Sequence, residues 1–119
     1  MPRRAEHAPA ARPLDAGDAD RIADAMSVFG TGSRISLLYA LLGTERSVDE
    51  LAVWTGLSPN VVSQQLRVLR LYRLVEGRRD GRYMRYSITD EHVVDLLSAI
   101  RAHLDHLTVA EGGEPPRAR

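Results

Sequence analysis

Cysteine is absent from the 119-residue sequence. Its absence excludes disulfides, thiolate metal sites and thiol catalysis, and it fits a cytoplasmic protein, where disulfides are rare. Long apolar runs are also missing, since no segment approaches the ~20 apolar residues needed to span a bilayer. The N-terminus carries Arg3 and Arg4 without an apolar stretch after them, so it does not resemble a secretory signal. We therefore expect a cytoplasmic protein with no membrane-spanning segment.

Lysine is absent as well, so that all 16 basic residues are arginine, and the formal net charge is zero. The charge is nevertheless unevenly distributed. Residues 67–85 hold seven arginines against Glu76 and Asp80, whereas residues 87–119 hold six carboxylates against three arginines. A locally basic segment of this kind is a candidate for contact with nucleic acid, even though the chain as a whole is neutral.

The length suits one compact domain. Residues 1–13 are rich in Ala, Arg and Pro and lack periodic apolar positions, which predicts a disordered N-terminal arm. We expect the folded domain over residues 14–108 and a flexible tail over 109–119, where Gly112-Gly113 and Pro115-Pro116 occur. His7 lies in the arm; it is either an incidental residue or an auxiliary metal ligand.

Apolar spacing and capping residues predict a series of helices in the first part of the domain. Ser47 and Glu50 form a capping box, in which each side chain can bond the backbone amide of the other. Ser58-Pro59 is a second start signal, because serine caps well and proline suits the first helical position. The helices are expected over residues 15–29, 33–42, 48–55 and 59–71.

The helix that begins at Pro59 has two different faces. Its apolar side carries Val62, Leu66 and Leu69. The opposite side lacks carboxylates and lysine, which normally populate a solvated surface, and instead offers amides, a hydroxyl and a guanidinium that can read base edges in a major groove. The candidate DNA-reading residues are Asn60, Ser63, Gln64 and Arg67. With the preceding helix and the short turn at 55–57, this segment predicts a helix-turn-helix.

A β-hairpin is expected next, with strands over 74–78 and 82–88 and a turn at 79–81. Four arginines surround its tip: Arg78, Arg79, Arg82 and Arg85. The alternative is an ordinary solvated hairpin, but four arginines against one aspartate favour a wing that contacts DNA phosphates or the minor groove. The predicted fold is mainly α with a small β-hairpin, a winged helix-turn-helix.

The last predicted helix, residues 89–106, holds three of the four histidines. Asp90 and His92 lie at its start, where Thr89 is the expected N-cap, and His103 and His106 lie near its end. His92 and His103 share a face, yet eleven residues at 1.5 Å each separate them by ~16 Å, too far for one ion to bridge within a chain. Two such helices packed antiparallel would bring the start of one to the end of the other and create two symmetric metal sites.

The sequence at this point resembles the winged-helix core of the ArsR/SmtB family of bacterial repressors. The resemblance rests on residues 63–70, 74–75, 78–82 and 86–88, together with Arg34, and it covers roughly residues 15–108. It implies a homodimer paired through its terminal helices, an operator with inverted-repeat symmetry, and an inducer that weakens DNA binding. It also implies that the exposed side of the helix at 59–71 faces DNA.

The family places sensor sites at several locations, and the type that uses cysteine is excluded here. Another type uses Asp-x-His at the start of the last helix and His-x-x-His near its end. Asp90, His92, His103 and His106 match all four positions. The expected apolar seam between the paired helices consists of Val93, Leu96, Leu97, Ile100 and Leu104.

Three imidazoles and one carboxylate make a complete tetrahedral set, which favours Zn(II). Ni(II) or Co(II) is the alternative, in which ligands from the N-terminal arm, such as His7, join the same site. A further alternative is a winged-helix repressor with incidental histidines and a non-metal inducer. An enzyme is disfavoured, because the sequence lacks an HExxH motif, paired carboxylates and a nucleophile elbow. We expect a metal-responsive transcriptional repressor that binds operator DNA in its metal-free form.

Overall fold

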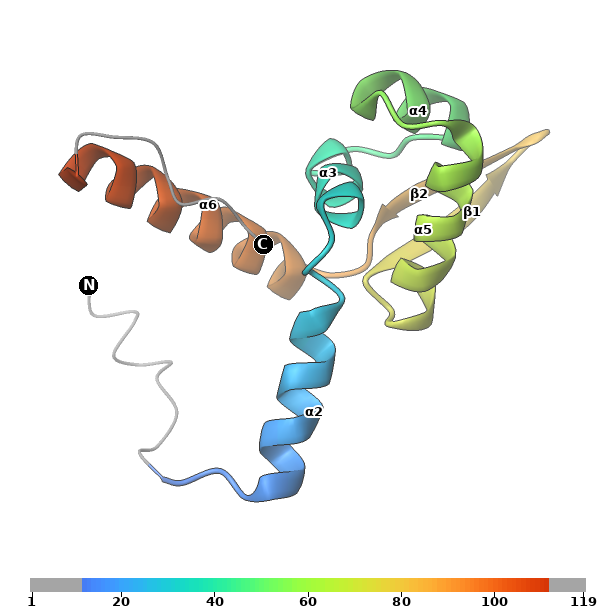
Figure 1. Ribbon diagram of the computed structural model, residues 1–119. Helices are drawn as coiled ribbons and strands as arrows, with labels where there is room; N and C mark the ends of the chain where they lie inside the picture. The colour runs from blue at the N-terminus through green and yellow to red at the C-terminus, as the bar shows by residue number, and fades with distance from the viewer. Residues whose placement is uncertain (1–11, 112–119) are drawn as a thin grey trace.

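The computed structural model describes residues 12–111. In this part of the chain five helices and one antiparallel hairpin follow one another (Figure 1). The elements are α2 (Ala16–Ser27), α3 (Gly32–Ala40), α4 (Val48–Thr55), α5 (Pro59–Leu71), β1 (Val75–Asp80), β2 (Tyr83–Ile88) and α6 (Glu91–Glu111). Each predicted helix and strand is present, with ends that differ by a few residues. His7 and most of the predicted arm and tail lie outside the described residues.

The helix starts follow from local chemistry. Asp15 caps α2 by accepting a hydrogen bond from the amide of Asp18, and Ser47 and Glu50 form the expected capping box on α4. Ser58 caps α5 by accepting from the amide of Val61 at 3.2 Å. Each cap satisfies an amide that the first turn of a helix leaves without a partner.

The core is formed by α3, α4, α5, the base of the hairpin and the first part of α6. Its buried side chains are Val28, Leu37, Leu38, Leu41, Leu51, Val62, Leu66, Leu69, Val75, Val93 and Leu97. The expected inward side of α5 is confirmed, since Val62, Leu66 and Leu69 are all fully buried. Burying a leucine of this kind contributes roughly 1.5–3 kcal/mol, so the core fixes how α5 lies on the other helices.

The hairpin pairs Val75 with Ile88 and Asp80 with Tyr83. Its loop is therefore Gly81-Arg82, and the predicted turn at 79–81 is wrong by about one residue. Gly81 has a φ of 62°, a value that glycine adopts without strain at the first position of a two-residue hairpin loop. The shorter loop extends both strands, so that Arg79 lies within β1 and Arg82 lies in the loop at the tip.

Helices α2 and α6 project away from this core, as Figure 1 shows. No residue of α2 is buried, and apolar Ile22 and Met26 are exposed on it. The radius of gyration is 16.6 Å, against ~13 Å for a compact domain of about 100 residues. The two projecting helices thus leave apolar surface without a partner in a single chain. No helix among the described residues is long and apolar enough to cross a membrane.

Candidate DNA interface and metal-sensing helix

The exposed side of α5 carries the four side chains that the sequence offered for reading bases. Asn60, Ser63, Gln64 and Arg67 are all exposed, while the opposite side of the same helix is buried in the core. None of the four makes an ion pair with another described residue. The arrangement presents two amides, a hydroxyl and a guanidinium to solvent, and their contact with DNA remains a prediction.

Arg34, at the start of α3, contacts α5 on the side that faces the core. Its Nε donates to the carbonyl oxygen of Val28 at 2.7 Å, and its Nη1 donates to Oε1 of Gln65 at 3.1 Å. Gln65 is half-buried, unlike its neighbours Ser63 and Gln64. Arg34 therefore ties the end of α2 to the middle of α5. Sequence spacing gave no sign of this contact, because Arg34 and Gln65 are 31 residues apart.

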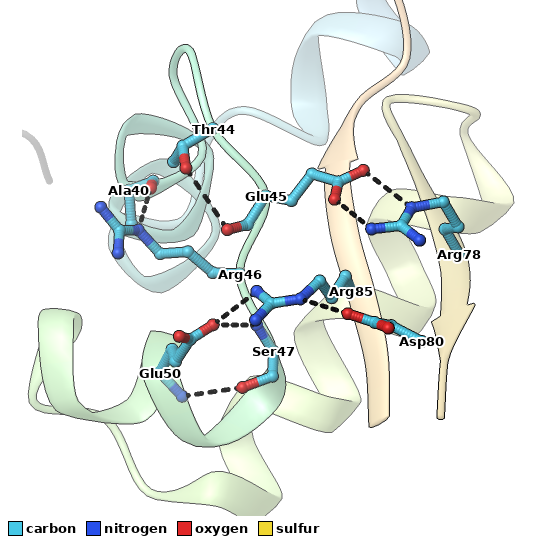
Figure 2. Close-up of polar contacts among 9 residues, drawn as sticks. All are labelled: Ala40, Thr44, Glu45, Arg46, Ser47, Glu50, Arg78, Asp80 and Arg85. Atoms are coloured by element: carbon cyan, nitrogen blue, oxygen red, sulfur yellow. Dashed lines mark hydrogen bonds and ion pairs between the residues drawn. The ribbon is translucent and has the colours of Figure 1, made fainter. Parts of the chain in front are cut away.

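The wing arginines divide into two kinds. Arg78 donates from Nε and Nη2 to the two carboxylate oxygens of Glu45, at 3.2 and 2.6 Å, and this contact lowers the pKa of the Glu45 carboxyl below its ordinary value. Figure 2 shows this pair beside a second group around Arg85. Arg79 and Arg82 are exposed, and neither has an ion-pair partner in the described part of the chain.

Arg85 contacts two carboxylates from different elements. Its Nη1 lies 3.0 Å from Oε1 of Glu50 and its Nε lies 3.1 Å from Oδ2 of Asp80. The same Glu50 oxygen accepts from the backbone amide of Ser47 at 2.9 Å, and this hydrogen bond is the main cause of the lowered pKa of the Glu50 carboxyl. The capping group of α4 is thus also a partner of the wing.

At the start of α6, Asp90 accepts a hydrogen bond from the amide of Val93 at 3.2 Å. Asp90 therefore caps the helix, which begins at Glu91, and the prediction that Thr89 is the cap is wrong. The amide of Thr89 instead donates to the carbonyl oxygen of Leu74. The cap brings Asp90 close to His92, whose Nδ1 lies 3.6 Å from the Asp90 Oδ1.

The candidate metal ligands are all accessible. The side chain of His92 is 98% exposed and that of Asp90 is 53% exposed, and His103 and His106 are exposed further along α6. Within the single chain over residues 12–111, no group of three or more metal-binding side chains comes together. The two halves of the predicted quartet thus stay apart in one protomer. That they hold an ion between two protomers remains a prediction.

The apolar residues of α6 fall into a buried group and an exposed group. Val93 and Leu97 are buried in the core of their own chain, so their predicted place in a seam between helices is wrong. Leu96, Ile100 and Leu104 are 48%, 45% and 40% exposed and form a stripe at i, i+4 and i+8. These three remain available to a partner.

One contact between α6 and the core was not expected from the sequence. The hydroxyl of Tyr39, in α3, donates to the carbonyl oxygen of Leu97, and the guanidinium of Arg101 lies 5.4 Å from the centre of the Tyr39 ring. Leu97 thus anchors α6 twice, through its buried side chain and through its backbone. The 58 residues between Tyr39 and Leu97 explain why local patterns do not reveal this link.

The fold agrees with comparisons to known proteins. The model of the arsR family of bacterial regulatory proteins matches residues 31–76. The HTH-type transcriptional regulator NmtR of Mycobacterium tuberculosis is 38% identical over 106 residues, which make up 89% of this chain and 88% of NmtR. A transcriptional repressor SmtB homolog of Synechocystis is 41% identical over 86 residues, 72% of this chain and 65% of that protein.

Among solved structures, the homodimeric winged helix-turn-helix DNA-binding domain Mb0332 from Mycobacterium bovis has a TM-score of 0.70 at 32% identity. The match covers 82% of this chain and 94% of that one. The predicted winged helix-turn-helix is therefore confirmed, and the relatives are regulators rather than enzymes. This chain belongs to the ArsR family of bacterial transcriptional regulators.

Proposed function

We propose that this regulator is a metal-responsive repressor that binds operator DNA as a metal-free homodimer and leaves it when Zn(II) binds. Each of two symmetric sites takes Asp90 and His92 from one protomer and His103 and His106 from the other. The supporting observation is that the three exposed histidines lie on or beside the same face of α6 as its exposed apolar stripe. A single surface therefore offers both the dimer contact and the ligands.

The angular positions of these side chains around the axis of α6 show which of them share this face. At 100° per residue, and with Leu96 at 0°, His92 lies at about −40° and His103 at about −20°, while Ile100 and Leu104 lie at about +40° and +80°. His106, at about −80°, flanks the same face. Antiparallel pairing across this stripe would bury Leu96, Ile100 and Leu104 and carry His92 of one chain toward His103 of the other.

The donor set fits a zinc ion. Three neutral imidazoles and one carboxylate are the usual number and kind of ligands for tetrahedral Zn(II). One oxygen of Asp90 is used by the helix cap, and the other makes no hydrogen bond to a described residue, which leaves it free to bind an ion. Ni(II) or Co(II) is the alternative, with more ligands supplied by the N-terminal arm that contains His7.

On the DNA side, two recognition helices related by a two-fold axis fit an inverted-repeat operator. They would enter successive major grooves about one helical turn, or ~34 Å, apart. Amides and guanidinium groups can read base edges there, and wing arginines can contact the backbone. The residues proposed for direct contact are Asn60, Ser63, Gln64, Arg67 and, on the wing, Arg79 and Arg82, while Arg78 and Arg85 lie beside them in the same wing.

The test uses a duplex that the metal-free protein selects from random sequence. His103→Ala should keep metal-free DNA affinity and lose metal-induced release. Ser98→Ala is the matched control, because Ser98 is exposed but lies about 200° around α6 from Leu96; it should keep both properties. Metal-induced release that persists in His103→Ala would show that the ligand assignment is wrong.

The identity of the metal is tested by titrating the same complex with Zn(II), Co(II) and Ni(II). Strong tetrahedral ligand-field bands of the Co(II) protein, with Zn(II) as the best effector, would support zinc. Six-coordinate spectra that change with His7→Ala would support nickel or cobalt. DNA binding that none of the three metals alters would point to a non-metal inducer.

A further inference from the structure

The wing of this protein contacts more carboxylates than its arginine-rich sequence suggests. Two of its four arginines belong to what we term the wing ion-pair cluster: Glu45, Glu50, Arg78, Asp80 and Arg85 (Figure 2). Its three carboxylates and two guanidinium groups sum to a formal charge of about −1 at neutral pH. The region around Arg78 and Arg85 is therefore not a basic patch, and the wing arginines without an ion-pair partner among the described residues are Arg79 in β1 and Arg82 in the loop.

The strand register explains why this cluster is needed. Arg78 and Arg85 are direct cross-strand partners. Like charges directly opposite one another destabilise a hairpin. Glu45 neutralises Arg78 through a bidentate contact, the strongest arrangement available to this pair. Glu50 and Asp80 neutralise Arg85 with one contact each, from two sides.

The carboxylates also connect the wing to the helix-turn-helix. Glu45 lies in the loop before α4, and its neighbour Arg46 pairs with Tyr86 of β2 through two backbone hydrogen bonds of 3.0 and 2.8 Å. Glu50 lies in the first turn of α4. The cluster therefore joins both strands of the wing to the start of α4, and α4 packs on α5 in the same core.

We propose that Arg78 and Arg85 are positioning residues that set the angle of the wing, and that Arg79 and Arg82 are the wing's phosphate contacts. The proposal rests on the DNA-binding function described above. Arg79 and Arg82 are exposed and lack ion-pair partners among residues 12–111. For Arg78 to reach a phosphate it would have to exchange a bidentate carboxylate for it, which would leave Glu45 unpaired beside the DNA.

Salt dependence separates the two roles, because log affinity falls linearly with log salt concentration and each phosphate contact adds ~0.9 to the steepness of that fall. The probe is a mixed-sequence duplex of about 30 base pairs, long enough for two half-sites. Binding by the metal-free full-length protein is measured over a salt series. Arg79→Gln and Arg82→Gln should each lower the steepness of this salt dependence by ~0.9 per wing.

Arg78→Gln should weaken binding at every salt concentration but leave the slope of the unsubstituted protein. The double substitution Glu45→Arg with Arg78→Glu is the critical control, because it restores an ion pair with unchanged total charge. It should recover most of the lost affinity. Thermal unfolding of each variant shows that binding is measured on folded protein.

Two results would overturn the assignment: a slope in Arg78→Gln that falls as far as in Arg79→Gln, or a charge-swapped protein that binds no better than Arg78→Gln. Both are distinct from a failure of the underlying function. If the unsubstituted protein bound no duplex at low salt, the DNA-binding function itself would be refuted, and the roles of all four arginines with it.

Discussion

Asp90 has an observed role as a helix cap and a proposed role as a metal ligand, and substitution can separate the two. Its carboxylate caps α6 through the amide of Val93, and it is also a proposed metal ligand. Asparagine caps helices about as well as aspartate, whereas alanine does not. Asp90→Asn should therefore keep most of the cap and lose the charged ligand, while Asp90→Ala should lose both.

The expected magnitudes follow from the single capping bond. Losing a side-chain cap costs about 1 kcal/mol, which lowers the unfolding temperature of a domain of about 100 residues by roughly 4–8 °C. Asp90→Asn should cost only a few tenths of a kcal/mol, mainly from the lost charge at the helix N-terminus. The assay is thermal unfolding of the metal-free protein at one fixed concentration, since dimer stability depends on concentration.

Metal affinity should show a different order. Both variants lose a charged ligand, so both should bind Zn(II) at least ~10-fold more weakly, the loss typical even for residues that only support a ligand. Competition with a coloured zinc chelator measures this. Zinc affinity that is unchanged in Asp90→Asn would refute the ligand role, and an unfolding temperature that is unchanged in Asp90→Ala would refute the cap.

Three other substitutions or conditions test separate parts of the structure. Arg73 has a φ of 59°, in a motif at the C-terminal end of α5 where glycine is the usual residue. Arg73→Gly should therefore raise the free energy of unfolding by about 0.5–1 kcal/mol, whereas Arg73→Ala should not. Tyr39→Phe removes the hydrogen bond to Leu97 and should lower the free energy of unfolding by about 1 kcal/mol. It should also reduce metal-induced DNA release. Equal release from Tyr39→Phe and the unsubstituted protein would exclude a role of this hydrogen bond in coupling. The pKa values of the Glu45 and Glu50 carboxyls are lowered in the folded protein. The stability that these carboxylates contribute is therefore present above the ordinary carboxyl pKa and is lost as pH falls through their folded-state pKa values. The free energy of unfolding of Glu45→Gln should accordingly depend less steeply on pH in the acid range than that of the unsubstituted protein.

The sequence predicted those features that depend on neighbours along the chain. The two faces of α5 follow from helical periodicity, and the caps at Ser47 and Ser58 follow from side chains three residues from their partners. The placement of three histidines on one helix is equally local. Each of these predictions required only the geometry of a single element.

The features that the sequence did not reveal depend on distant partners. Arg78 finds Glu45 across 33 residues and Arg85 finds Glu50 across 35, so four similar arginines could not be sorted into paired and free. Val93 and Leu97 share an apolar pattern with Leu96 and differ from it only because the core covers them. The cap of α6 was misassigned because adjacent Thr89 and Asp90 are both good capping residues.

These contacts also suggest how α6 could influence the wing. Tyr39 contacts the backbone of α6, and the carbonyl oxygen of the next residue, Ala40, accepts from Nε of Arg46 at 2.8 Å. Arg46 in turn pairs with Tyr86 in β2. A displacement of α6 on metal binding would thus reach the wing through contiguous contacts, without passing through α5. Because binding free energies are reciprocal, the proposed release of DNA by metal requires that DNA binding weaken metal binding by the same factor. If this connection carries the coupling, Tyr39→Phe should reduce both factors equally, and factors that are unchanged in this variant would show that the coupling takes another route.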